Sequence, residues 1–350
     1  TLVQNGSDKI GGSTVNASLS TEGLAVTLVF VDSTQGWLVT DNGTQDTVPT
    51  AQYIVATGGT ITTVCTDYKV HTFTGPGTFC VSNVGNACGS NTVDYLVVAG
   101  GGSGGGRYGG GGGGGGFREG YNPGSYTASP LATTALSVSV QGYGVVIGGG
   151  GAQPATDTPG DACGSAAGTK GNNSVFSTIT STGGGGGAGQ GNGCSAVQNG
   201  GSGGGADYTV GNNGTGNTPP VSPPQGNNGG NNGTCSGSPY TSGGGGGATA
   251  VGATSTPSNP GAGGAGATSS INGTPTARAG GGGGGGTVHV PVGGSPGGAG
   301  GGGNGGSVAG ARTCAGTVNT GGGGGGGYGN PGMGGAGGSG IVIIRYKFQN

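Results

Sequence analysis

Gly109-Gly-Gly-Gly-Gly-Gly-Gly-Gly116 is the longest unbroken run of glycine in this chain. Further runs follow at 183–187, 243–247, 280–286 and 321–327. Glycine supplies 103 of the 350 residues in all. Because glycine has no side chain, these runs cannot form a hydrophobic core, and any order in them must come from hydrogen bonds of the backbone.

The surrounding sequence favours one conformation for these runs. Collagen requires glycine strictly at every third residue together with abundant proline, whereas this chain has 17 prolines and no three-residue phase. A flexible linker has no reason to end on strands, yet the β-branched segments Tyr95–Ala99 and Ile341–Tyr346 bracket the glycine-rich region. The pattern favours a bundle of polyglycine II helices with three residues per turn, which bond sideways to one another. Disorder and a glycine-rich β-stack are the alternatives.

Apolar segments and turn signals divide the chain into three parts, and no helix is expected in any of them. Residues 1–48 form a small β module, and residues 49–99 form a β-hairpin module in which 68–73 pairs with 78–81. Residues 100–350 form the glycine-rich domain, with variable loops and a closing C-terminal strand. Further strands are expected at 1–4, 14–20, 25–31, 36–39, 93–98, 131–140 and 175–179.

Bulk composition excludes several classes of partner. The net charge is −2 and only 6% of residues are charged, so we expect no nucleic-acid binding. The longest apolar stretch, Leu24–Val31, is far shorter than the roughly 20 residues of a membrane helix, so we expect no membrane insertion. Since the chain opens on Thr1 rather than methionine, we expect it to be the end portion of a longer chain or a processed product.

Cysteine and histidine offer little chemistry at the sequence level. None of the seven cysteines forms a C-x-x-C pair, so we expect disulfides rather than a metal site; buried reduced thiols are the alternative. Cys65 could be linked to Cys80 or Cys88 across a hairpin. We expect His71 to be a partly exposed structural residue, and we expect neither catalysis nor a cofactor. The candidate disulfide cysteines are Cys65, Cys80, Cys88, Cys163, Cys194, Cys235 and Cys314.

Five stretches resemble known proteins. Asn5-Gly-Ser-Asp-Lys-Ile-Gly-Gly12 followed by Leu24–Trp37 resembles a short β module of bacteriophage virion fibre proteins. Tyr68–Phe73, Asp94–Gly102 and Gly340–Lys347 resemble the glycine-rich domain common in phage tail fibres. The resemblance implies a place on the virion surface, in a tail fibre, with other fibre or baseplate proteins as partners. It also implies that the loops between polyglycine helices recognise a host cell-surface protein or glycan.

Our leading hypothesis is a trimeric, non-enzymatic fibre protein whose glycine-rich domain acts as an adhesin in host attachment. Because the first module is too short to bury much surface alone, we expect it to share its core with other copies. Loop tyrosines are the candidate receptor contacts, since tyrosine brings a large contact area at low entropic cost, although each could equally fill a gap in the bundle. The alternative is a structural protein without a receptor: a capsid or tail decoration, or an extracellular filament subunit. The candidate tyrosines are Tyr121, Tyr126, Tyr208, Tyr240 and Tyr328.

Overall fold

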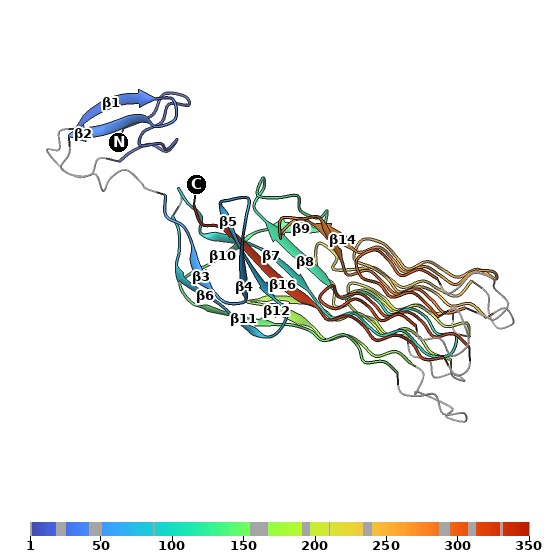
Figure 1. Ribbon diagram of the computed structural model, residues 1–350. Helices are drawn as coiled ribbons and strands as arrows, with labels where there is room; N and C mark the ends of the chain where they lie inside the picture. Colours follow the sequence, from blue (N-terminus) through green and yellow to red (C-terminus); the bar gives the residue numbers. More distant parts are fainter. Residues whose placement is uncertain are drawn as a thin grey trace.

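The described residues form strands and extended segments (Figure 1). The computed structural model describes residues 2–18, 26–41, 51–86, 88–154, 167–190, 197–209, 211–233, 240–286, 295–306, 313–329 and 332–349. Within these ranges there is no helix, so the prediction of a mostly β and irregular fold is confirmed. No helix in the described part of the chain could cross a membrane.

Sixteen strands occur in the described residues. They are β1 (Thr27–Asp32), β2 (Gly36–Asp41), β3 (Val55–Thr57), β4 (Thr60–Val64), β5 (Tyr68–Phe73), β6 (Gly77–Asn83), β7 (Thr92–Val98), β8 (Phe117–Tyr121), β9 (Ala132–Thr134), β10 (Leu136–Ser137), β11 (Gly142–Val146), β12 (Ser174–Phe176), β13 (Ile179–Ser181), β14 (Ala267–Ser269), β15 (Thr276–Arg278) and β16 (Ile341–Lys347).

Two sheets pack against each other at one end of the glycine-rich domain. The larger has the strand order β4-β5-β16-β7-β8-β9, with β10 beside β7, and the smaller has the order β13-β12-β11-β6-β3. Their facing side chains form one apolar core, in which Phe79, Tyr143 and Phe176 of the smaller sheet meet Tyr95 and Val342 of the larger. The C-terminal strand β16 lies in the middle of the larger sheet, between β5 and β7.

The larger sheet is buried on both faces. Alternate residues of β7 and β16 point away from the smaller sheet, among them Leu96 and Ile343, and pack on Ala248, Ile271 and Ala279 at the near end of the glycine runs. This second core explains why β7 and β16 are almost continuously buried instead of alternating between buried and exposed. The closing strand predicted from Ile341–Tyr346 is therefore the link between the sandwich and the glycine bundle.

The hairpin expected from 68–73 and 78–81 does not form. β5 pairs with β4 and β16 in the larger sheet, whereas β6 pairs with β11 and β3 in the smaller one. The turn between them therefore carries the chain from one sheet to the other. The strand pattern was right, but the partners were wrong: each strand pairs on one edge with an earlier neighbour, β4 or β3, and on the other edge with a strand from later in the chain, β16 or β11.

The glycine runs are polyglycine II helices, as the spacing of their hydrogen bonds shows. In the run 109–116, the N–H groups of residues 110, 113 and 116 donate to segment 182–188. Those of residues 111 and 114 donate to segment 243–246, and those of residues 109, 112 and 115 donate to segment 321–327. A neighbour that recurs at every third residue requires three residues per turn. The carbonyl oxygens of the same run accept N–H groups from three further segments, namely 99–105, 202–205 and 282–285.

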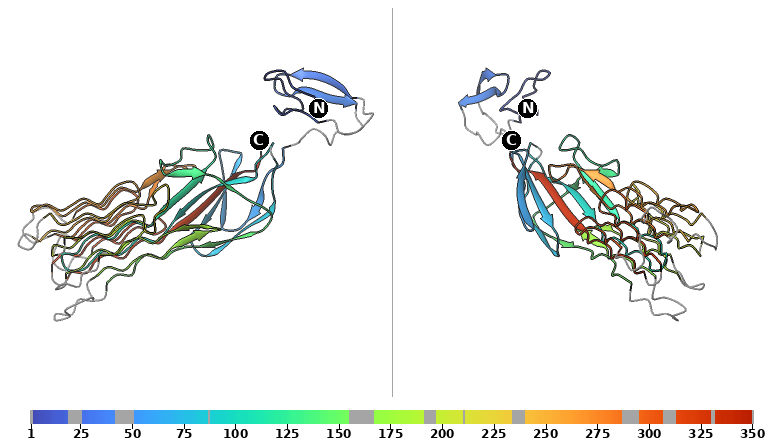
Figure 2. Two further views of the ribbon diagram at one scale, coloured as in Figure 1. Left: turned by 180° about the vertical axis from the view of Figure 1, so that it is seen from behind. Right: turned by 45° about the vertical axis from the view of Figure 1, so that its right-hand side comes forward.

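This run is thus the centre of a cross-bonded bundle with six neighbours. Its N···O distances lie between 2.7 and 3.2 Å, which is ordinary hydrogen-bond geometry. The helices extend side by side, away from the sheets, as wavy traces (Figures 1 and 2). Most neighbours run antiparallel to the central run, while 243–246 runs parallel to it.

Close approach of the backbones explains why the runs are glycine. A Cβ placed on Gly111 would lie 2.0 Å from the carbonyl oxygen of Gly282, and one on Gly112 would lie 2.2 Å from that of Gly102. Because the obstructing atoms belong to the backbone, no side-chain rotation can relieve the contact. The glycine runs are therefore a steric requirement of the packing.

The N-terminal β module has very little core among its described residues. β1 and β2 form an antiparallel hairpin, and only Ile10 and Ala17 are buried apolar residues in this part of the chain. The strands expected at 1–4 and 14–20 are reduced to a single bridge between Leu2 and Ala17, and residues 19–20 lie outside the described ranges.

Candidate functional site

The connections between the polyglycine helices alternate between the two ends of the bundle. Run 109–116 enters β8 at the end that faces the sheets, so the connection 106–108 that precedes it lies at the opposite end, here called the distal tip. Run 321–327 pairs with this same part of the bundle, since Gly327 donates its N–H to Gly105. The residues that follow Gly327 therefore also lie at the distal tip.

Four tyrosines from four separate connections converge at the distal tip. The ring of Tyr108 lies 5.1 Å from that of Tyr240, 5.7 Å from that of Tyr208 and 6.5 Å from that of Tyr328, measured between centroids. The rings of Tyr208 and Tyr240 are 4.6 Å apart. These distances and the tilted or edge-on angles are typical of favourable aromatic pairs. We call Tyr108, Tyr208, Tyr240 and Tyr328 the tyrosine cluster.

Members of the tyrosine cluster differ in how far they are exposed to solvent, so a buried ring that supports the cluster can be told from rings that are available to a ligand. Tyr328 is only 3% exposed and fills the base of the cluster. Tyr108, Tyr208 and Tyr240 are each partly exposed. Three of the five tyrosines expected from the sequence thus meet at one place, and two of these three present surface to solvent.

Tyr108 has an unusual backbone, which positions its ring. Arg107 and Tyr108 both have positive φ angles, 46° and 50°, a conformation that bulky residues adopt rarely and at an energetic cost. Backbone bonds at both sides hold this turn: Arg107 donates its N–H to Gly332, and the hydroxyl of Ser242 donates to the carbonyl of Tyr108. The constrained turn directs the central ring of the cluster toward its three partners.

Two tyrosines of the cluster have hydroxyl groups whose pKa is shifted by their surroundings. Burial, together with the nearby Tyr240 and Asp207, raises the pKa of the Tyr208 hydroxyl, and burial likewise raises the pKa of Tyr328. The Tyr208 hydroxyl accepts a hydrogen bond from Gln190 at 2.5 Å. Three partly exposed rings with hydroxyl groups form a surface that can pack on apolar groups and also exchange hydrogen bonds.

The other two expected tyrosines lie elsewhere. Tyr121 ends β8 and Tyr126 follows it, and their rings are 5.9 Å apart. Tyr126 donates its hydroxyl to Glu119 at 2.9 Å, and its ring lies 5.2 Å from the guanidinium of Arg345. Tyr126 is therefore held against a buried charged group beside the larger sheet, away from the distal tip, and its contact with a receptor stays a prediction.

Arg345 belongs to a group of buried charges on the face of the larger sheet that meets the bundle. Its guanidinium donates to the carbonyl oxygens of Ser125 and Ile271 and lies 4.1 Å from the ring centroid of Tyr68. Asp94 is opposite Arg345 in the strand register. Burial raises the pKa of Asp94 to about 6, although hydrogen bonds from Asn122 and Ser125 oppose that rise.

Tyr108 is the member of the cluster that sequence reasoning missed. It stands in Arg107-Tyr108 between two glycine runs, the same context that identified Tyr208, Tyr240 and Tyr328. An aromatic residue directly beside a glycine run was the available signal. Tyr121, by contrast, is the last residue of β8 and Tyr126 follows that strand, which places both at the end of the bundle that faces the sheets.

His71 and the cysteines also differ from expectation. His71 is fully buried rather than partly exposed, because the smaller sheet covers its face of β5: its ring packs edge-on to Phe79 at 5.0 Å. Burial lowers its pKa. Cys65, Cys80, Cys88 and Cys314 carry free thiols, so the expected link from Cys65 to Cys80 or Cys88 is not formed, since β5 and β6 belong to different sheets. Cys163, Cys194 and Cys235 lie outside the described residues.

Comparison with known proteins gives one match. The family described as "Glycine-rich domain" matches residues 73–347, which begin at the end of β5 and include all four tyrosines of the cluster and the closing strand β16. No curated protein and no solved structure matches the chain.

Proposed function

Because the chain belongs to the glycine-rich domain family, we propose that the bundle is a rigid scaffold whose distal tip attaches a bacteriophage to its host. In this proposal the protein is a non-enzymatic component of a virion fibre, and its ligand is a host cell-surface protein or glycan. The observation that carries the proposal is the convergence of tyrosines from four connections on one partly exposed patch.

A cross-bonded bundle suits this role for an energetic reason. Ordering flexible loops on binding reduces affinity, whereas here the tip connections begin and end on helices held by hydrogen bonds on all sides. Tyrosine brings large contact area with few rotatable bonds, and aromatic residues dominate binding hot spots. The phage assignment itself rests on the sequence resemblance of the segments around Asn5–Gly12 and Leu24–Trp37.

The proposal is tested with the double substitution Tyr208→Ala and Tyr240→Ala. We expect adsorption of the particle to its host to fall by at least ~30-fold, the effect of removing about 2 kcal/mol of hot-spot contact. Tyr121→Ala is the matched control, because Tyr121 is also partly exposed but lies at the sheet end; it should adsorb normally. Normal adsorption of the double variant, with thermal melting unchanged, would favour a structural protein without a receptor.

We further propose that three copies associate through the N-terminal β module. Phe30 and Trp37 remain 50% and 40% exposed, although their rings touch at 5.6 Å. Beside them lies a cavity of about 330 Å³ lined mainly by apolar residues, including Leu2 and Leu28. A two-stranded hairpin is marginal alone, so other copies of the module would complete its core.

Sedimentation of the full chain tests this association. We expect three times the mass of one chain, and we expect Phe30→Asp to dissociate the assembly, because it introduces a charge into the shared apolar surface. Val251→Asp is the matched control, since Val251 is 61% exposed in the glycine-rich domain and should leave the mass unchanged. A single-chain mass for the unmodified protein would contradict the proposal.

A further inference from the structure

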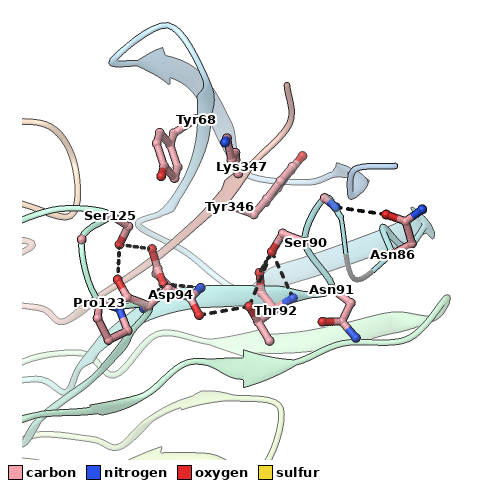
Figure 3. Close-up of a pocket in the computed structure, with 13 residues that line it drawn as sticks. Tyr68, Asn86, Ser90, Asn91, Thr92, Asp94, Pro123, Ser125, Tyr346 and Lys347 are labelled. Carbon is pink, nitrogen blue, oxygen red and sulfur yellow. Dashed lines mark hydrogen bonds between the residues drawn. The ribbon is translucent and has the colours of Figure 1, made fainter. Parts of the chain in front are cut away.

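A second cavity lies at the end of the domain opposite the tyrosine cluster. It has a volume of about 410 Å³ and opens between the end of β16, the start of β5 and β7, and the turn 122–125 (Figure 3). This volume falls in the range of small-molecule sites, roughly 300–1,000 Å³. We call it the polar pocket.

One wall of the polar pocket is a continuous strip of hydroxyl and amide groups. Ser90 donates its hydroxyl to the carbonyl of Thr92, and the Thr92 hydroxyl donates to the side-chain oxygen of Asn122 at 3.2 Å. Asn122 and Ser125 in turn donate to the carboxylate of Asp94, at distances from 2.7 to 3.0 Å. Figure 3 shows these bonds as one chain across the pocket wall.

The strip leaves defined hydrogen-bonding capacity for a ligand. The single hydroxyl protons of Ser90 and Thr92 are used within the strip, and the Ser90 oxygen also accepts the N–H of Thr92 at 3.4 Å. Since a hydroxyl oxygen has two lone pairs, each of the two oxygens retains capacity as an acceptor. The side-chain amide of Asn122 has two hydrogens, of which one is used toward Asp94. Asp94 belongs to the lining but is only 1% exposed, so its main role is to orient Asn122 and Ser125.

The opposite wall is aromatic. The partly exposed ring of Tyr68 lines it (Figure 3), and the guanidinium of Arg345 lies 4.1 Å from the centroid of that ring. Tyr346 also belongs to the lining, but it is only 4% exposed and its hydroxyl bonds His71 and Ala56 in the core between the sheets. The charged residues that line the pocket are Asp94 and Lys347, one of each sign. The lining therefore does not select ions of one sign, and no group of three or more His, Cys, Asp or Glu side chains that could hold a metal ion occurs among the described residues.

From this geometry we propose that the polar pocket binds a neutral sugar unit. A pyranose has hydroxyl groups that both donate and accept, which match the strip, and an apolar C–H face, which matches the aromatic wall. The site is independent of the tyrosine cluster and of host attachment, because it lies at the other end of the bundle and shares no residue with the tip.

Ligand-observed NMR on the full chain tests the proposal with glucose, galactose, mannose and N-acetylglucosamine as probes. We expect at least one of them to bind with a dissociation constant on the order of 1 mM. Thr92→Val removes one acceptor from the strip without changing the side-chain shape, and should weaken binding by about fivefold, as expected for one neutral hydrogen bond. Ser90→Ala should act in the same direction.

Thr62→Val is the matched control, because Thr62 lies on the exposed strand β4, away from the pocket. It should bind the sugar as the unmodified chain does, and thermal melting should show all three variants folded. The proposal is overturned if no probe binds the unmodified chain at concentrations of about 100 mM. It is equally overturned if folded Thr92→Val and Ser90→Ala both bind with unchanged affinity.

Discussion

Gly112→Ala should prevent the glycine-rich domain from folding. Gly112 lies in the central polyglycine helix, where its N–H donates to Gly324 and its carbonyl accepts from Gly282, each at 2.8 Å. The added Cβ would meet backbone atoms of residues 102 and 103 at 2.2 to 2.8 Å. Overpacking an ordinary core costs about 1–3 kcal/mol, and here the rigid backbone cannot repack, so we expect a loss above ~3 kcal/mol. Urea unfolding of soluble protein, or its recovery as aggregate, measures the effect.

Gly149→Ala is the control for this experiment, since it makes the same change inside another glycine run. A Cβ at Gly149 would meet only the side-chain nitrogen of Asn172, at 3.7 Å. We expect an unchanged or slightly higher urea midpoint, because alanine reduces the entropy of the unfolded chain by about 0.4–1 kcal/mol. If both variants were equally stable, steric packing would not be the reason for glycine at position 112.

The pair of variants also separates two explanations of glycine-rich sequence. Under a flexible-linker explanation every glycine would be equally replaceable, whereas in the bundle the effect of alanine depends on the distance to the next backbone. The sequence was sufficient to predict polyglycine II, because unbroken glycine excludes collagen and strands bracket the region. It was not sufficient to predict which helix lies beside which, since glycine runs carry no side chains that distinguish one neighbour from another.

The sequence did not show which strands pair with each other, for a related reason. Segment 78–81 has the pattern of a strand and follows a turn after 68–73, which favours a local hairpin. In the structure both segments pair with strands from distant parts of the chain, β16 and β11 among them. Local patterns show that a segment is extended, whereas long-range packing decides the edge on which it pairs.

At the candidate site, too, local sequence patterns showed the residue types, whereas long-range packing decided which residues meet. The residue type and its place beside a glycine run were visible in the sequence at Tyr208, Tyr240 and Tyr328. Their convergence with Tyr108 depends on the packing order of the helices, because adjacent runs in the bundle, such as 109–116 and 321–327, are far apart in the chain. That Tyr126 lies away from this cluster was likewise not visible in the sequence, because its hydroxyl partner Glu119 and its guanidinium partner Arg345 meet only in the folded sheet.

Val342→Asp should abolish the fold of the sandwich and the bundle together. Val342 is fully buried near the start of β16, opposite Val97 of β7 and Phe73 of β5. A carboxylate there would be unpaired in the apolar core, at a cost of several kcal/mol, and the lost valine contacts add about 1.5–3 kcal/mol. The sum approaches the whole stability of a typical domain. We expect the variant to be digested throughout residues 51–349 under limited proteolysis.

Val146→Asp makes the same substitution on β11, where the side chain is 50% exposed, and should leave protease resistance intact. The comparison tests whether the last strand of the chain completes both halves of the structure. Since β16 pairs with β5 and β7, which lie far from it in the sequence, neither apolar core is complete until β16 has paired. Contacts between residues far apart in the sequence make folding slow. Digestion of the sandwich alone, with the polyglycine bundle still resistant, would show instead that hydrogen bonds among the glycine helices suffice to hold the bundle without its closing strand.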